Sequence, residues 1–432
     1  MLNYFPNFQP GFVSGMLNKK KDVQNYKTFV EMLGTVLSQS NNQSEVVGIL
    51  CAVVSESLVD KDIAGIIHKF LPENLVTTSY GEYISRILPG ILNLLCTKDG
   101  VNKEVYFKEL LLRYHKISTS DLGLICKALK KNLKVRMLDF RYCSLRDETA
   151  HDLANMLSHN STVEDLYIEQ NLFTAEAAKI LAGNLRQNTT LKELSLSYND
   201  LEDVGVKAIT AALTPDTSLM GMATRNNDND HSDRKDGRRC SALHKLYLLA
   251  TKCGEQGAFA VAEMLRSNKT LLQLHIGGNP LGCKGVTSIA KALKSNRTLN
   301  YLDLRNTDCG DEGAAAIADM LTSNKTLTEL KICKFQYKAA WINKVGKDGA
   351  VALADALRVN NSLKKLHLKD NDITDEGFKC LAEALLINTA LEILCVKYPG
   401  DGLAALDQDT RERVKKRITL EMCYCCIDKF EY

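Results

Sequence analysis

The sequence predicts an α/β solenoid in which short parallel strands line one layer and helices form the other. A leading leucine recurs every 28 residues, for example at Leu271, Leu299 and Leu327. Each copy opens with the strand pattern L-x-x-L-x-L and continues, after a polar turn, into a helix such as AAAIADMLT, with apolar residues three and four apart. A single strand–turn–helix unit cannot bury its apolar face alone, so neighbouring copies must stack.

The repeat accounts for about eleven copies between residues 107 and 400. Eight of the ten intervals between copies are 28 residues long, one is 24 and one is 36. The copies start at Phe107, Val135, Val163, Leu191, Leu219, Leu243, Leu271, Leu299, Leu327, Leu363 and Leu391. Such regular spacing predicts a parallel inner sheet with one strand from each copy.

The strand cores LKELSLSYN, LLQLHIGGN and LKKLHLKDN resemble the leucine-rich repeat family in its longer, ribonuclease-inhibitor-like subclass. The tails of NOD-like receptors and the Ran GTPase-activating protein share that subclass. The resemblance implies a leucine-rich repeat horseshoe of about eleven 28-residue β-α repeats, with an N-terminal helical domain. It implies little about function, because this fold is a platform for many functions.

Asparagines recur at two places in the repeat. One set follows the strand, where the side-chain amide can satisfy backbone groups of the adjoining coil: Asn171, Asn199, Asn227, Asn279 and Asn371. The other set forms N-x-[ST] sequons at Asn160, Asn188, Asn268, Asn296, Asn324 and Asn360. These six share one repeat position, so we interpret them as helix ends and not as glycosylation sites. For Asn324 we expect the left-handed conformation that Asn tolerates there.

The chain before the repeats has a different pattern. Residues 1–24 are expected to be a disordered arm. Residues 25–104 carry four helical apolar stripes, and we predict a helical bundle or cap that covers the open end of the solenoid. A recruitment domain like those of NOD-like receptors is the alternative. No G-x-x-x-x-G-K-[ST] motif occurs, so the nucleotide-binding (NACHT) ATPase of those receptors is missing.

The copy that starts at Leu219 keeps the strand pattern LMGMATRNN but has no apolar helix after it. The irregular loop 228–242 is highly charged instead, and includes DNDHSDRKDGRR. We interpret this loop as a degenerate copy. Two alternatives stay open: a docking loop, and a basophilic-kinase site at Ser241 after two arginines.

An insertion at 335–345 explains the 36-residue interval and holds the only tryptophan, Trp341. Its indole is either an anchor for a partner or a cover for its own repeat. Residues 401–432 are expected to form a C-terminal helical cap, with a helix over 403–420, and a tail that contains Cys423, Cys425 and Cys426. The tail lacks the second Cys/His pair that a zinc site needs, so we expect free thiols there, with palmitoylation or redox use as alternatives.

Composition excludes several classes of protein. The net charge of +3 on 432 residues gives no strong field for nucleic acid or a membrane surface. No apolar run is long enough to span a bilayer, and no secretory signal is visible. The 14 cysteines are scattered, which favours a cytoplasmic protein with reduced thiols.

The inner strands supply the candidate binding residues. In each copy the fifth and seventh residues point to the concave side, and many are tyrosine or arginine, the residue types enriched in protein interfaces. Two basic clusters, Arg113 with Arg141 and Lys331 with Lys369 and Lys397, suit a partner with acidic patches. The predicted partner-binding residues are Arg113, Arg141, Tyr142, Tyr167, Tyr198, Arg225, Tyr247, His275, Arg305, Lys331, Trp341, His367 and Lys369.

No catalytic constellation emerges, because the eight histidines are scattered and neither G-x-S-x-G nor H-E-x-x-H occurs. We therefore predict a non-enzymatic protein–protein interaction scaffold with a NOD-like-receptor-related regulatory role. We expect no cofactor and no metal, and the sequence does not decide the oligomeric state. The alternative is a GTPase-activating protein resembling the Ran GTPase activator. Against it, this chain has a basic terminal helix where that family has an acidic tail.

Overall fold

The computed structural model describes residues 108–186, 188–215, 241–334 and 341–397, the short strands at 74–76 and 418–419, and residues 92, 408, 411 and 412. The arm, most of the helical region, nearly all of the loop 228–242, Arg225 and the tail cysteines lie outside these residues. The chain divides into two compact units, Met1–Leu172 and Phe173–Tyr432, which are described separately.

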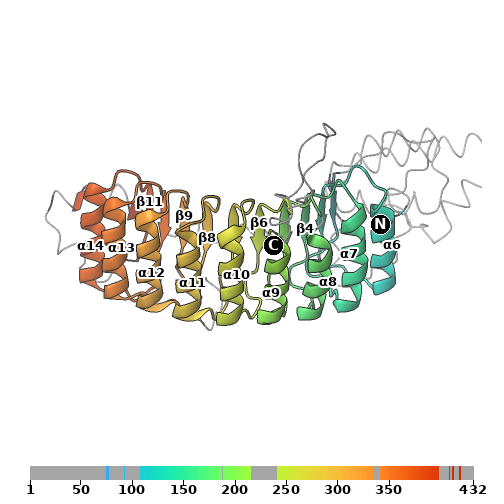
Figure 1. Ribbon diagram of the computed structural model, residues 1–432, viewed down its shortest axis with the longest axis horizontal. Helices are drawn as coiled ribbons and strands as arrows, with labels where there is room; N and C mark the ends of the chain where they lie inside the picture. Colours follow the sequence, from blue (N-terminus) through green and yellow to red (C-terminus); the bar gives the residue numbers. More distant parts are fainter. Residues whose placement is uncertain are drawn as a thin grey trace, which may run out of the picture. The chain divides into compact units, whose positions relative to one another are not determined.

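In the unit Met1–Leu172, repeats alternate strand and helix as predicted (Figure 1). Its elements are β1 (Asn74–Val76), β2 (Glu109–Leu111), α6 (Thr119–Leu129), β3 (Met137–Asp139), η2 (Asp147–Thr149), α7 (Ala150–His159) and β4 (Asp165–Tyr167). All strand pairs are parallel and follow chain order. β1 lies inside the region expected to be helical and extends the sheet beyond β2.

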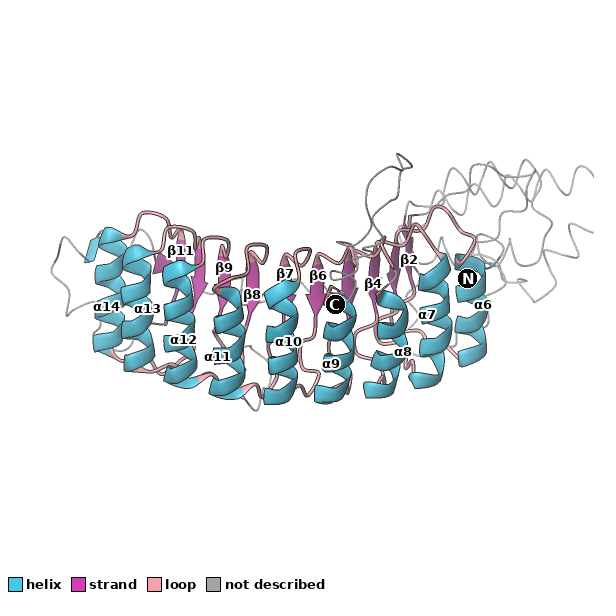
Figure 2. Ribbon diagram, in the orientation of Figure 1, coloured by secondary structure: helices cyan, strands magenta, loops and turns pink. Residues whose placement is uncertain are grey.

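In the unit Phe173–Tyr432, strands form one layer and helices the other (Figure 2). The helices are α8 (Ala175–Leu185), α9 (Glu202–Leu213), α10 (Glu255–Ser267), α11 (Gly282–Leu293), α12 (Gly310–Ser323), α13 (Lys347–Val359) and α14 (Asp375–Ile387). The strands are β5 (Glu193–Ser195), β6 (Lys245–Tyr247), β7 (Gln273–His275), β8 (Tyr301–Asp303), β9 (Glu329–Lys331), β10 (Lys365–His367), β11 (Ile393–Cys395) and β12 (Ile418–Thr419). They pair in parallel and in chain order.

The core lies between the two layers, where the repeat pattern predicts it. The strand leucines Leu299, Leu302 and Leu304 are buried, and so are Ile317 and Leu321 on helix α12. The alternation of the strand sends its middle leucine into this core and its two flanking side chains to the other face. We call that other face, turned away from the helices, the inner face of the sheet.

The predicted strand of the Leu219 copy lies outside the described residues. β5 and β6 pair directly, with Ser195 opposite Tyr247, and α9 packs against α10. The Asn268 side chain also donates a hydrogen bond to the carbonyl of Leu213 across this junction, at 2.9 Å. The copies that start at Leu191 and Leu243 are therefore direct neighbours in the sheet and in the helix layer.

The C-terminal segment differs from the predicted continuous helix over 403–420. Residues 408, 411 and 412 are helical, but Ile418 and Thr419 form β12 and pair with β11. The sheet thus extends past the last predicted copy.

The asparagines that follow the strands form the predicted ladder. The Asn279 carbonyl oxygen accepts hydrogen bonds from the backbone N–H groups of Thr251 and Cys253, and its amide donates to the carbonyls of Leu248 and Ile276. Each such side chain therefore joins its own turn to the turn of the preceding copy. Asn343, which we did not predict and which lies within the insertion 335–345, does the same toward Thr307 and Leu304.

The sequon asparagines lie between helix and strand as predicted, and they are buried. The expected conformation of Asn324 is wrong, because its φ of −77° and ψ of 130° are extended. Its side chain explains its position: the amide donates to the carbonyl of Leu293 on the preceding helix, and the oxygen accepts from the N–H groups of Thr326 and Leu327. This asparagine bridges two helices and does not need a left-handed cap.

Two helices are capped by the helix before them. The N-cap residues of α10 and α13 are Gly254 and Gly346, which have no side chain to accept a hydrogen bond. Asp203 of α9 accepts from Gly254 at 2.7 Å, and Asp311 of α12 accepts from Gly346 at 2.7 Å. A carboxylate at a helix N-terminus is favourable. These two contacts join neighbouring repeats at the two places where the 28-residue period is broken.

Candidate functional site

Two rows of side chains cover the inner face of strands β6 to β10. Register alignment places Tyr247, His275, Asp303, Lys331 and His367 in one row across these strands. A second row, two residues earlier on each strand, consists of Lys245, Gln273, Tyr301, Glu329 and Lys365. Because the strands are parallel and in register, side chains in each row are nearest neighbours and the rows can contact each other diagonally.

Three rings and one ammonium group stack along these rows. The Tyr247 and His275 ring centroids are 4.3 Å apart, and those of His275 and Tyr301 are 4.5 Å apart. The Lys331 ammonium lies 5.4 Å from the Tyr301 ring centroid, within cation–π range. We call Tyr247, His275, Tyr301 and Lys331 the aromatic run. Both tyrosines are half-buried and keep part of each ring exposed.

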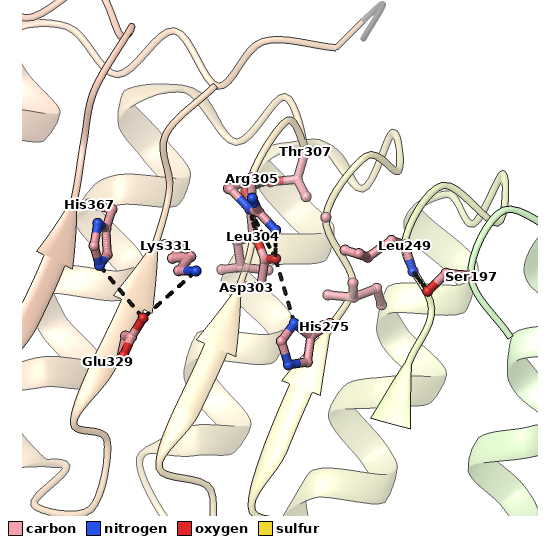
Figure 3. Close-up of polar contacts among 12 residues, drawn as sticks. Ser197, Leu249, His275, Asp303, Leu304, Arg305, Thr307, Glu329, Lys331 and His367 are labelled. Atoms are coloured by element: carbon pink, nitrogen blue, oxygen red, sulfur yellow. Dashed lines mark hydrogen bonds and ion pairs between the residues drawn. The ribbon is translucent and has the colours of Figure 1, made fainter. Parts of the chain in front are cut away.

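A buried ion pair lies beside the aromatic run (Figure 3). The Arg305 guanidinium donates to the Asp303 carboxylate through Nε, at 2.9 Å, and through Nη2, at 2.5 Å. His275 Nδ1 is 3.7 Å from the same carboxylate. Burial raises the pKa of Asp303, but the Arg305 charge and the hydrogen bonds from His275 and Arg305 outweigh it and hold this pKa far below its usual range. Asp303 is therefore ionised at neutral pH.

Gly277, two residues after the end of strand β7, leaves space for the Asp303–Arg305 ion pair. A Cβ there would lie 2.7 Å from the Arg305 carbonyl oxygen and 3.1 Å from a carboxylate oxygen of Asp303. No side chain can occupy that space without moving the backbone.

A second charged cluster surrounds Glu329 (Figure 3). Its carboxylate lies 3.6 Å from His367 Nε2, 3.8 Å from the Lys331 ammonium and 3.5 Å from the Lys365 ammonium. Burial raises the pKa of Glu329. The hydrogen bond with His367 and the charges of Lys331 and Lys365 lower this pKa by more than burial raises it, so the pKa lies below its usual value. Lys331 thus belongs both to this cluster and to the aromatic run.

The unit Met1–Leu172 carries a related arrangement on its own inner face. Asp139 is buried, and it accepts hydrogen bonds from Arg113 of the preceding copy and from Arg141 of its own. The Arg141 guanidinium lies 5.6 Å from the Tyr167 ring centroid. Asp139 and Arg141 have the same two-residue spacing as Asp303 and Arg305.

The predicted binding residues fall into three groups. Tyr142 and Trp341 are exposed, with 43 % and 41 % of their surface accessible. Arg113, Arg141, Tyr167, Tyr198, Tyr247 and Lys369 are half-buried. His275, Arg305, Lys331 and His367 are buried, and Arg225 lies outside the described residues.

Two of the predicted contact residues need correction. Arg305 is 1 % exposed and His367 is fully buried, so neither presents a surface to a partner. Arg305 is held by Asp303, and His367 lies against Glu329. Their position in the strand predicts the correct face of the sheet. Asp303 and Glu329 lie on the same face, and the contacts with these carboxylates keep the side chains of Arg305 and His367 buried against the sheet.

Sequence reasoning missed Tyr301 and Glu329. Both stand two residues before the row that we considered, at the third position of the strand pattern. The alternation of a strand places the third, fifth and seventh residues on one face, so this signal was present in the sequence.

The described residues give no sign of metal or thiol chemistry. Among them no group of three or more His, Cys, Asp or Glu side chains could hold a metal ion. All eight described cysteines are free, and burial raises the pKa of several, that of Cys309 to about 12. Such thiols are protonated at neutral pH and behave as small apolar side chains. Ser241 is also buried and its hydroxyl accepts a hydrogen bond from Leu243, which disfavours the kinase-site interpretation.

Among the described helices, none has both the length and the apolar character required to cross a bilayer.

Comparisons with known proteins identify leucine-rich repeats in the chain. A leucine-rich repeat family model matches residues 187–209 and 359–382. The model of the TMOD/LMOD leucine-rich domain matches residues 235–340, which contain strands β6 to β9. No curated protein matches the sequence significantly.

Three solved structures are similar to this chain at low identity. Leiomodin-1 actin-binding site 2 is 20 % identical, with 33 % of this chain and 79 % of that chain covered and a TM-score of 0.27. The yeast complex of Rad7 and Elc1 is 13 % identical, with 87 % and 89 % covered and a TM-score of 0.40. An internalin (inlF) from Listeria monocytogenes is 14 % identical, with 96 % and 98 % covered and a TM-score of 0.42.

Proposed function

We propose that this leucine-rich repeat protein is a non-enzymatic scaffold that binds a protein partner through the inner face of strands β6 to β9. The aromatic run carries the proposal, because it places two half-buried tyrosines on strands β6 and β8, with His275 of β7 stacked against both. Tyrosine is among the residues that dominate binding energy at protein interfaces.

The surroundings of the aromatic run favour tight binding. His275 stacks against both tyrosines, and the Lys331 ammonium lies 5.4 Å from the Tyr301 ring centroid. These contacts limit the rotamer freedom that the rings can lose when a partner binds, which lowers the cost of association. The buried carboxylate of Asp303 lies 3.7 Å from His275 Nδ1, and the half-buried carboxylate of Glu329 lies 3.8 Å from the Lys331 ammonium.

The finer features of this role are proposals as well. We propose a ribonuclease-inhibitor-like arrangement of repeats, a regulatory role related to that of NOD-like receptor tails, and a partner with acidic patches that meet the half-buried Lys369. GTPase activation stays the alternative, and the identity of the partner decides it: a small GTPase would favour the activator.

The first prediction concerns the two tyrosines. Replacing Tyr247 and Tyr301 together with alanine should weaken partner binding by about 1–4 kcal/mol for each tyrosine that is a hot spot. The intact chain and the variant are used as baits in a native lysate, captured proteins are quantified, and the affinity of the purified partner is then measured by calorimetry.

The matched control is Val359→Ala, an exposed apolar position at the end of helix α13 in the helix layer. The control should capture the same partners as the intact chain. Equal capture by all three baits would contradict binding through the inner face.

A second candidate function is actin binding. The match of residues 235–340 to the TMOD/LMOD leucine-rich domain favours it, because this segment holds the whole aromatic run. One similar solved structure is leiomodin-1 actin-binding site 2. If actin is the partner, the intact chain should co-sediment with actin filaments or bind monomeric actin, and the Tyr247→Ala/Tyr301→Ala variant should bind about tenfold or more weakly. Absence of binding to both forms of actin would exclude this candidate and leave the general proposal standing.

A further inference from the structure

The unit Met1–Leu172 carries a pair of arginines whose side chains are held by one buried carboxylate. Arg113 Nε lies 2.5 Å from Asp139 Oδ2, and Arg141 donates to Asp139 through Nε at 3.0 Å and Nη2 at 2.7 Å. The Asp139 side chain is only 1 % exposed, whereas those of Arg113 and Arg141 are 28 % and 15 % exposed. The carboxylate thus lies beneath two guanidinium groups that reach the surface.

The same chain contains a natural comparison. Asp303 and Arg305 repeat the Asp139–Arg141 spacing, but Arg305 is buried and the residue equivalent to Arg113 is Gly277. In that copy the ion pair fills the space above the glycine and holds the sheet together. In the copy at Asp139 the second arginine occupies that position, and both guanidinium groups stay partly accessible.

Both arginines keep hydrogen-bond donors available. Arg113 uses only Nε toward Asp139, and Arg141 uses Nε and Nη2. Among the described residues nothing accepts a hydrogen bond from Nη1 or Nη2 of Arg113, or from Nη1 of Arg141. A guanidinium group suits a planar oxyanion because its donors form a fixed fork.

Aromatic rings stand beside these donors. The Tyr114 and Tyr142 ring centroids are 4.7 Å apart, and Tyr142 is exposed. Both tyrosines have a positive φ, 66° and 60°, a conformation that is strained for bulky residues. The same repeat position also has a positive φ at Gln170, Tyr198 and Ala250, so this backbone conformation belongs to the repeat and not to the pair. The exposed Tyr142 ring, stacked on Tyr114, places aromatic surface next to the arginine donors.

We propose that Arg113, Arg141, Tyr114 and Tyr142 form a second docking surface, which binds an acidic peptide segment of a protein partner by holding an Asp or Glu carboxylate. The charges favour a carboxylate over a phosphate. The two guanidinium charges face the buried carboxylate of Asp139, and the buried Glu169 also acts on Arg141. The surface therefore offers directed donors and no large positive excess, which suits a single negative charge better than a double one.

The test selects peptides from a random library displayed on phage, using the intact chain as bait. Arg113→Ala serves as the comparison, because Asp139 keeps its two hydrogen bonds from Arg141 in that variant. Arg136→Ala is the matched control, since Arg136 is an exposed arginine of the same unit, paired with Glu164. We expect the enriched peptides to contain Asp or Glu and to bind Arg113→Ala about tenfold more weakly than the intact chain or the control.

Each outcome decides the proposal. Replacing the acidic residues of a selected peptide with Asn or Gln should abolish binding, and adding salt should weaken it. No enrichment, peptides without acidic residues, or equal binding to Arg113→Ala would overturn the proposal, and tighter binding of a phosphoserine version would overturn the choice of a carboxylate. If a thermal melt shows that Arg113→Ala is unfolded, Arg113→Lys replaces it, with the same loss expected because lysine lacks the fork. The result is independent of Tyr247 and Tyr301, so it is distinct from the test of the inner face in the other unit.

Discussion

Replacing Arg305 with alanine is expected to lower the free energy of unfolding by about 3–5 kcal/mol, as for other buried ion pairs that lose one partner. The carboxylate of Asp303 is fully buried, and Arg305 supplies its closest donors, at 2.5 and 2.9 Å. After the substitution the nearest remaining side-chain nitrogen among the contacts of this carboxylate would be Nδ1 of His275, at 3.7 Å. Urea unfolding of the intact chain, followed by circular dichroism, measures the change.

Two comparisons separate this pair from an ordinary ion pair. The double variant Asp303→Ala/Arg305→Ala should be less destabilised than the sum of the single variants, because it leaves no unpaired buried charge. The control pair Lys252–Asp200 lies on the surface, with 68 % and 47 % of the side chains exposed, and Lys252→Ala should cost less than about 1 kcal/mol. A change of that small size for Arg305→Ala would contradict the role of the pair.

The same pair should make stability depend on pH in a definite direction. The folded-state pKa of Asp303 is lowered, so ionised Asp303 stabilises the fold above its unfolded pKa of about 3.9. This stabilisation is lost as the pH falls below that value toward the folded-state pKa, and Glu329 acts in the same direction. Between about pH 5 and pH 2 the intact chain should therefore lose stability more steeply than Asp303→Asn.

The sequence predicts the face on which Arg305 lies but not that its side chain is buried. The strand pattern predicts its face correctly, yet the same Asp-x-Arg spacing gives a half-buried arginine at Arg141 and a buried one at Arg305. The difference arises from neighbours on adjoining strands, where Gly277 leaves room and His275 contacts the shared carboxylate. Such cross-strand contacts depend on which copies pair, so one copy examined alone cannot reveal them.

The pairing of β5 with β6 makes the same point for the fold. The periodicity predicts every described strand from β2 to β11, because each copy has both an L-x-x-L-x-L strand and an apolar helix to cover it. The Leu219 copy has the strand pattern but no apolar helix pattern after it in the sequence, and β5 pairs directly with β6. The spacing of leucines alone does not predict this pairing.

The second large effect is expected at Asn343, a ladder residue within the insertion 335–345. Its carbonyl oxygen accepts from the N–H and the hydroxyl of Thr307, at 2.8 and 2.9 Å, and its amide donates to the carbonyls of Leu304 and Ile332. Asn343→Ala would leave these buried groups without a partner, at about 1–3 kcal/mol for each group that water cannot reach. We expect a loss of about 3–4 kcal/mol in urea unfolding, similar to that of Asn279→Ala.

The Asn343→Ala prediction also tests whether the ladder continues from β8 to β9 despite the longer interval. A strict 28-residue period places the ladder residue at Phe335, but the eight extra residues move it to Asn343, where it still joins the turn of β9 to that of β8. The eight extra residues therefore precede the ladder residue, which still makes its ladder hydrogen bonds. The control Asn361→Ala, at an exposed asparagine, should change stability by less than about 0.5 kcal/mol. If Asn343→Ala were no more harmful than this control, the turn at Asn343 would have to reach water, and the ladder would not be continuous from β8 to β9.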